Sequence, residues 1–207
     1  MRRSRAILIW AAVAVAVVAP VAIAATSPLL AWRDPFYIAA GFAGVIAMGL
    51  LLLQPLLAGG YLPGAGASRG RRFHAWIGVG VLAAVVVHVA GLWVSSPPDV
   101  IDALLFRSPT PFSAWGVVAM WAVFATALLA ATWRRFRLPP RVWRIAHLIL
   151  AAVIVLGGVV HALLIEGTME TLSKAAICLL VVAATLKLML DIRSRRKSTR
   201  RRAPQSA

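Results

Sequence analysis

Residues 73–94, FHAWIGVGVLAAVVVHVAGLWV, decide the fold class. The stretch contains no Asp, Glu, Lys or Arg, and most of its residues are aliphatic. Because a helix rises about 1.5 Å per residue and the bilayer core is about 30 Å thick, roughly 20 apolar residues cross a membrane. This stretch is therefore predicted to be a membrane-spanning helix. It contains two histidines, His74 and His88, although histidine is rare within membrane-spanning helices.

Five further segments are comparably long and apolar: about 6–25, 36–57, 113–133, 142–165 and 171–191. The connections between them are rich in proline and glycine, which end helices. The chain has 207 residues, of which 61% are hydrophobic and 14% charged. In soluble domains, roughly half of the residues are hydrophobic and roughly a quarter are charged. We therefore expect an all-α membrane protein in which residues 1–207 form one domain, a bundle of six transmembrane helices.

The positive charges alternate from one side of the predicted bundle to the other. Of the 22 Lys and Arg residues, 18 fall at the N-terminus, in the second and fourth connections and in the C-terminal tail. This clustering between apolar runs argues against a nucleic-acid partner, despite a net charge of +16. Loops rich in Lys and Arg stay in the cytoplasm. We therefore expect a multi-pass plasma (inner) membrane protein with both termini cytoplasmic and residues 192–207 as a basic tail.

The first apolar segment has a second interpretation. Arg2, Arg3 and Arg5 precede an apolar run that ends in Ala22-Ile23-Ala24, a pattern that resembles a cleavable secretion signal. The apolar run of about 20 residues is longer than a signal core, and its retention keeps the charge alternation intact. We expect the segment to be retained as the first span.

All four histidines lie in two of the predicted spans. His74 and His88 are in the third span, and His147 and His161 are in the fifth, and both pairs are 14 residues apart. At about 100° per residue, 14 residues fall about 40° short of four turns, so each pair lies on one helix face with about 21 Å between its members. The two spans run in the same direction. His74 is therefore expected level with His147 near the cytoplasm, and His88 level with His161 near the outside.

Two levels of facing imidazoles are what two haems need if each iron takes one axial nitrogen from each helix. A haem with both axial positions filled relays electrons instead of binding oxygen. The chain has no Cys-x-x-Cys-His, so we expect two haem b groups per chain that are held without a covalent bond. Two alternatives are hydrogen bonding between helices and zinc binding. Zinc needs three or four close ligands, which the 14-residue interval does not provide.

Several of these residues carry a resemblance to a known family. Residues 71–74 (RRFH), His88, residues 143–147 (WRIAH) and residues 161–168 (HALLIEGT) resemble the ferric reductase-like transmembrane domain. This superfamily includes ferric-chelate reductases, the membrane domain of NADPH oxidases and the haem membrane subunit of the bacterial periplasmic methionine-sulfoxide reductase. The resemblance extends from the second span to the sixth, and the spacing of the four histidines is its specific part.

The resemblance implies a ligand set and an activity. His74 and His147 would hold the iron of an inner haem, and His88 and His161 that of an outer haem, both between the third and fifth spans. The implied protein is an oxidoreductase that carries electrons from a cytoplasmic or membrane donor to an external acceptor, such as ferric iron or a periplasmic redox partner. No residue is assigned a catalytic role.

The eukaryotic relatives carry flavin and nicotinamide domains, whereas this chain ends 16 residues after the sixth predicted span. The electron donor is therefore expected to be a separate flavoprotein reductase or a membrane quinol.

Two arginines and three glycines near the histidines are further candidates. Arg72 and Arg144 lie within about one turn of the inner histidines and could pair with anionic haem propionates, or serve as ordinary cytoplasmic charges. Gly78, Gly91 and Gly157 lie three or four residues from a histidine. They would let a flat porphyrin approach, or let neighbouring helices pack closely.

Two other functions fit parts of the pattern. A quinol- or ascorbate-linked cytochrome b typically spreads its four ligands over four helices, whereas two helices carry them here. A non-redox transporter would use membrane histidines as proton relays. An external acidic set (Asp99, Asp102, Glu166 and Glu170) would attract ferric iron or a basic partner, or simply be solvated. The sequence leaves open the donor, the acceptor, the oligomeric state and the redox potentials.

Overall fold

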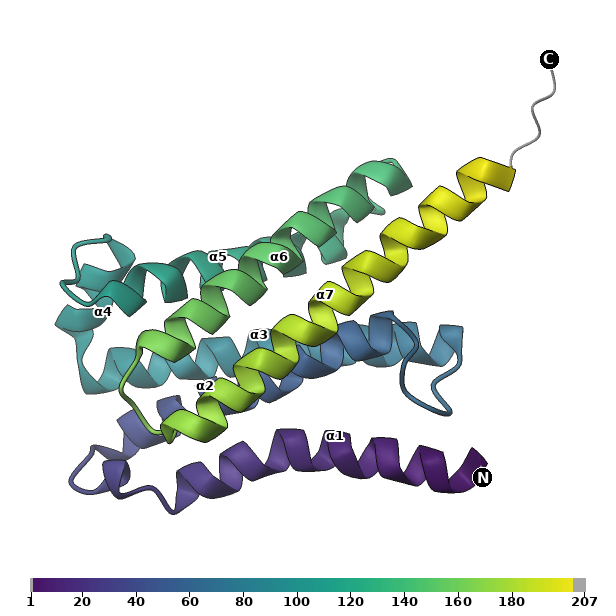
Figure 1. Cartoon of the computed structure of the whole chain (residues 1–207). Helices are drawn as coiled ribbons and strands as arrows, with labels where there is room; N and C mark the ends of the chain where they lie inside the picture. Colours follow the sequence, from purple (N-terminus) through teal and green to yellow (C-terminus); the bar gives the residue numbers. More distant parts are fainter. Residues whose placement is uncertain (1, 203–207) are drawn as a thin grey trace.

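The computed structural model describes residues 2–202, with side chains for residues 3–195 except Ala67. Six long helices make up the bundle: α1 (Arg2–Ala25), α2 (Pro35–Ala58), α3 (Ala67–Ser95), α5 (Pro111–Thr132), α6 (Pro140–Leu164) and α7 (Thr171–Arg202) (Figure 1). A 3₁₀ turn, η1 (Pro28–Leu30), precedes α2, and a short helix, α4 (Pro97–Leu104), lies between α3 and α5. The expected all-α, six-helix architecture is confirmed.

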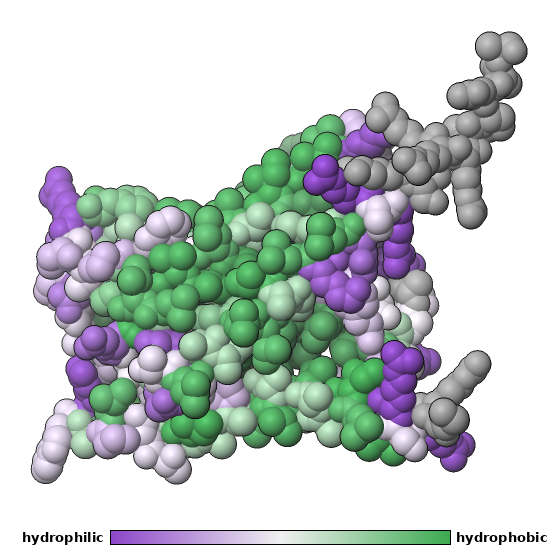
Figure 2. Space-filling model, in the orientation of Figure 1, coloured by the Kyte–Doolittle hydropathy of each residue, from purple (hydrophilic) through white to green (hydrophobic). Residues whose placement is uncertain are grey.

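All six long helices of the described chain are long and apolar enough to cross a membrane. Large apolar side chains such as Ile7, Leu128 and Leu179 lie on the outside of the bundle, each more than 60% exposed. Figure 2 shows the result as an apolar band across the molecule with hydrophilic residues gathered at its two ends. The chain is a multi-pass integral membrane protein, because such a surface is stable only in lipid.

Helix boundaries differ from the predicted spans where polar sequence continues a helix. α3 begins at Ala67, six residues before the predicted start, and α7 runs to Arg202 instead of ending at 191. Hydrophobicity reports the membrane-crossing part of a helix, whereas backbone hydrogen bonds continue into water. Most of the expected tail is therefore a continuation of α7, and its residues 203–207 lie outside the described part. The short helix α4 was not predicted.

The bundle consists of two antiparallel hairpins joined by a crossing helix. α2 packs along α3, α5 packs along α6, and α7 crosses between them to contact both α2 and α6. Figure 1 shows α7 running diagonally across the bundle and α1 along its edge. The buried core lies where α2, α6 and α7 meet, and its members are Met48, Leu52, Val159, Ile177, Cys178 and Val181.

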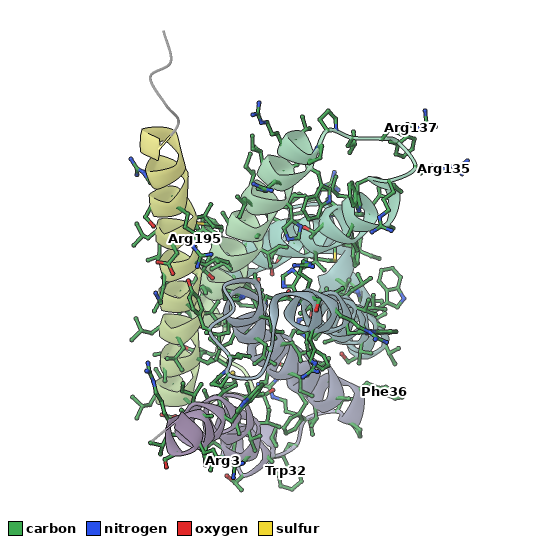
Figure 3. The ribbon with its side chains drawn as sticks, turned by 90° about the vertical axis from the view of Figure 1, so that its right-hand side faces the viewer. Arg3, Trp32, Phe36, Arg135, Arg137 and Arg195 are labelled. Carbon is green, nitrogen blue, oxygen red and sulfur yellow. The ribbon has the colours of Figure 1, made fainter. Side chains whose placement is uncertain are left out.

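The alternating helices give the molecule two chemically different ends. The basic end holds the N-terminus, the connections 59–66 and 133–139 and the end of α7, and Figure 3 looks along the bundle from this end. Arg135 and Arg137 point away from the bundle there. The far end holds the remaining connections, 26–34, 96–110 and 165–170.

Two carboxylates of the far end cap helices. Asp34 accepts hydrogen bonds from the backbone N–H groups of Phe36 and Tyr37 at the start of α2. Glu170 accepts from those of Leu172 and Ser173 at the start of α7, and these bonds lower the pKa of its carboxyl group. N-capping carboxylates stabilise helices by satisfying backbone donors. Glu170, one of the four acids expected on the external surface, therefore has a structural role.

At the basic end, a hydrogen-bonded cluster joins the 59–66 connection to α7. Lys187 pairs with Asp191 at 3.1 Å, one turn apart on α7. The Tyr61 hydroxyl donates to the same carboxylate at 2.5 Å, and the Lys187 ammonium lies 4.7 Å from the centre of the Tyr61 ring. Burial raises the pKa of Tyr61 from 10.0 to about 12, and the bond to Asp191 adds to the effect. The phenol is thus held neutral against a carboxylate.

This raised pKa gives a testable prediction. The folded protein binds the Tyr61 proton more tightly than the unfolded chain, so the stabilisation is complete below pH 10 and is lost as the pH rises through about 12. The chain has two tyrosines, so tyrosinate absorbance can be followed cleanly. Tyr61→Phe should abolish a late ionisation step near pH 12, whereas Tyr37→Phe should leave it. Persistence of that step in Tyr61→Phe would contradict the assignment.

Candidate functional site

The structure brings the four histidines together as two facing pairs, one at each level of the bundle. His74 of α3 and His147 of α6 form the basic-end pair, with ring centres 6.0 Å apart and planes at 66°. His88 of α3 and His161 of α6 form the far-end pair, with ring centres 6.2 Å apart and planes at 83°. The two helices that carry the pairs pack on other partners, α2 and α5, more closely than on each other. The histidines therefore reach across the space between two hairpins.

Three of the four rings are anchored by backbone carbonyls of a neighbouring helix. The Nδ1 atoms of His88 and His161 lie 2.7 Å from Ala40 O and 2.9 Å from Phe112 O, and that of His74 lies 3.2 Å from Gln54 O. A carbonyl can only accept, so each of these Nδ1 atoms carries the proton. The lone pair of each ring then lies on Nε2, which is the tautomer a metal-binding histidine needs.

His147 is the exception. Its Nδ1 is buried and has no hydrogen-bond partner among the described residues. Its ring instead stacks on Trp143, one turn earlier in α6, at 5.3 Å and with planes 13° apart. The basic-end pair is therefore oriented by one weak hydrogen bond and one aromatic stack, whereas the far-end pair has two short hydrogen bonds.

Two glycines make room for the far-end rings. A Cβ at Gly116 of α5 would lie 2.6 Å from His161 Nδ1, and one at Gly44 of α2 would lie 3.2 Å from His88 Nδ1. Each glycine is four residues after the carbonyl that accepts the hydrogen bond, Phe112 and Ala40 respectively. The missing side chain lets the imidazole lie directly against the helix backbone.

The glycines singled out by the sequence are placed differently. A Cβ at Gly78 would approach Gln54, one at Gly91 would meet Ala40, and one at Gly157 would meet α5 at the Trp115 carbonyl. All three contacts are with a neighbouring helix. Gly78, Gly91 and Gly157 therefore allow close helix packing, the second of the two roles expected from the sequence. Gly44 and Gly116 were not predicted from the sequence, because they lie on the helices that precede the histidine-bearing helices. Only helix packing brings them next to the rings of His88 and His161.

Arg72 and Arg144 lie at the basic end, on α3 and α6, two and three residues before His74 and His147. Both are exposed. Lys174, in the first turn of α7 at the far end, is buried, with 6% of its surface exposed. Its ammonium donates to Ile165 O at 2.7 Å, and so ties α7 to the end of α6 that follows His161.

The donor geometry fits an iron held between two imidazoles. A metal ion bonds an imidazole nitrogen at about 2 Å, so two rings on opposite sides of one ion have centres roughly 6 Å apart. Both observed pairs have this separation. No group of three or more His, Cys, Asp or Glu side chains able to hold a metal ion occurs in the part of the chain that the structure describes. A site with two protein ligands per level suits a haem, whose porphyrin supplies the other four nitrogens.

Comparison with known proteins identifies the family. The model of the "Ferric reductase like transmembrane component" matches residues 40–158, more than half of the chain. The chain belongs to the ferric reductase-like transmembrane component family. Membership implies transmembrane electron transfer and an oxidoreductase role, and the family typically binds haem. The match includes His74, His88 and His147 and ends three residues before His161. No curated protein and no solved structure matches the chain significantly.

The close approach of the His161 ring to Gly116 can be tested by substitution. Because the His161 ring is fixed against α5, Gly116→Ala should displace it, destabilise the protein by about 1–3 kcal/mol and weaken haem retention. Gly158→Ala is the matched control, since its Cβ would meet nothing closer than 3.9 Å. Thermal unfolding in detergent and haem content would be measured for both variants. Equal behaviour of the two would show that the close approach of His161 has no structural importance.

Proposed function

We propose that this protein carries electrons across the membrane through two b-type haems, one at each histidine pair. The pairing of all four histidines, with ring centres 6.0 and 6.2 Å apart, carries the proposal. His74 and His147 would hold one iron, and His88 and His161 the other. When bound, each haem supplies an iron that changes its charge by one electron without opening a coordination position.

The protein's own residues pre-organise these positions. Backbone carbonyls fix three imidazoles in the ligating tautomer, and the stack on Trp143 orients the fourth. Little has to move when the charge at the site changes, because the rings are held by packed helices. Arg72 and Arg144 would pair with the anionic propionates of the basic-end haem, since both are exposed cations two and three residues before its histidines.

Orientation follows from charge. Positive loops remain in the cytoplasm, so the basic end faces the cytoplasm and the far end faces outside. Electrons would enter at His74 and His147 and leave at His88 and His161. The external acceptor would be ferric iron or a redox partner protein, as in the family that the chain belongs to. A proton-relay transporter would not need all four rings paired at the separation of a shared metal ion.

Haem stoichiometry tests this function directly. Purified protein should contain about two haems per chain by pyridine haemochrome assay, and each single His→Ala change should reduce this to about one. Changes within one level, such as His88→Ala with His161→Ala, should not add, because both remove the same haem. Changes from different levels, such as His74→Ala with His161→Ala, should add and leave almost none. A wild-type ratio near zero would overturn the proposed function.

The electron donor is proposed to be a soluble flavoprotein that docks on the basic end. Opposite charges accelerate encounter, and flavoproteins are often acidic. The haem-reduction rate should therefore fall steeply as salt rises, because the Debye length shortens from about 30 Å at 0.01 M to about 8 Å at 0.15 M. Stopped-flow reduction in nanodiscs would measure this. A quinol enters from the lipid uncharged, so a salt-insensitive rate with quinol and no reduction by flavoprotein would contradict docking.

Charge variants supply the control for this experiment. Arg135→Gln with Arg137→Gln neutralises two exposed arginines of the basic end and should lower both the rate and its salt dependence (Figure 3). Arg107→Gln removes an exposed arginine in a connection of the far end and should change neither. An equal effect of the two changes would show that the basic end has no special role.

A further inference from the structure

The two histidine pairs are oriented by different means, and this asymmetry identifies a further residue. At the far end, both rings are fixed by hydrogen bonds of 2.7 and 2.9 Å to backbone carbonyls. At the basic end, the His74 bond is longer, at 3.2 Å, and His147 Nδ1 is buried without a partner in the described chain. A ring without a hydrogen bond is free to rotate about its χ2 bond unless packing prevents it. Something other than a carbonyl must hold His147.

Trp143 is placed to do so. It lies one turn before His147 on α6, and residues four apart share one helix face. Its indole and the imidazole are nearly parallel, at 13°, with centres 5.3 Å apart. Such offset stacking is a favourable aromatic arrangement. The large flat surface of the indole restricts the imidazole to one plane.

Trp143 is itself supported from the 133–139 connection. Trp133, at the end of α5, lies 5.5 Å from Trp143 with planes at 38°, and the Arg134 guanidinium lies 5.4 Å from the Trp133 ring. The α5–α6 connection therefore backs the tryptophan that stacks on the histidine. The Trp143 indole N–H is buried and has no partner among the described residues, so no hydrogen bond competes for its orientation.

We propose that Trp143 is the positioning residue of the basic-end pair, doing by stacking for His147 what backbone carbonyls do for the other three histidines. The proposal rests on the proposed function, in which His147 is an axial ligand. Stacking fixes the ring plane without accepting the Nδ1 proton, and that atom is buried without a partner among the described residues. A hydrogen bond to Nδ1–H raises the basicity of a metal-bound imidazole and favours the oxidised metal. Trp143 thus keeps His147 a weaker donor than the bonded far-end histidines.

Substitution of Trp143 tests this with two readouts other than activity. Redox titration and the low-spin ferric electron paramagnetic resonance spectrum would be recorded for each haem, with His147→Ala and His161→Ala identifying which signal belongs to which level. Trp143→Ala admits water to Nδ1 and frees the ring, so the basic-end haem should show a lower midpoint potential and a broadened or shifted signal. The far-end haem should be unchanged. Trp143→Phe keeps an aromatic face and should resemble the wild type.

Each alternative outcome is distinguishable. Unchanged potential and spectrum of the basic-end haem in Trp143→Ala would overturn the proposal, as would equal shifts of both haems. A Trp143→Phe variant that behaves like Trp143→Ala would also overturn the proposal, because an aromatic face at this position would then not hold the ring. Trp121→Ala is the matched control, because Trp121 of α5 is 56% exposed and packs against Phe124. Wild-type protein that binds no haem would instead refute the proposed function.

Discussion

The arrangement of this bundle depends on imidazole rings that reach across the space between two helical hairpins. Within each hairpin the helices pack closely, α2 on α3 and α5 on α6, but the two histidine-bearing helices are not packed on each other in this way. The facing rings lie 6.0 and 6.2 Å apart, a separation suited to a shared metal ion and too large for ring-to-ring hydrogen bonding. In lipid there is little hydrophobic force to bring helices together, so specific contacts decide their spacing.

At the far end, each hairpin orients its histidine through its first helix. Ala40 and Gly44 of α2 serve His88 in the same way that Phe112 and Gly116 of α5 serve His161. One residue supplies a carbonyl and the glycine four positions later leaves space for the ring. A backbone carbonyl in a helix has a second lone pair, so it can accept from the imidazole without giving up its helical hydrogen bond. The two hairpins thus provide related solutions at the far end, while the basic-end pair differs through Trp143.

Charged residues lie at both ends of the bundle, and some of them also connect α7 to the two hairpins. At the far end, Glu170 caps α7 and the buried Lys174 binds the Ile165 carbonyl just beyond α6. At the basic end, Tyr61 and Lys187 share the carboxylate of Asp191. These contacts tie α7 to both hairpins, whereas the arginines of the 133–139 connection are exposed (Figure 3).

The sequence alone determined the number of long apolar helices, the membrane setting and the histidine levels, because these depend on local hydrophobicity and on the helical repeat. The interval of 14 residues between His74 and His88 and between His147 and His161 was enough to match the rings by level. The helix ends differed from the predicted spans, because α3 and α7 continue through polar residues and α4 is short.

Only the tertiary structure decided which helix faces each ring. Gly44, Gly116 and the acceptor carbonyls of Ala40 and Phe112 lie 44 to 49 residues from their histidines, and the burial of Lys174 likewise depends on packing. Such contacts depend on how helices are rotated against one another, and a periodic pattern of apolar residues facing lipid does not encode that rotation.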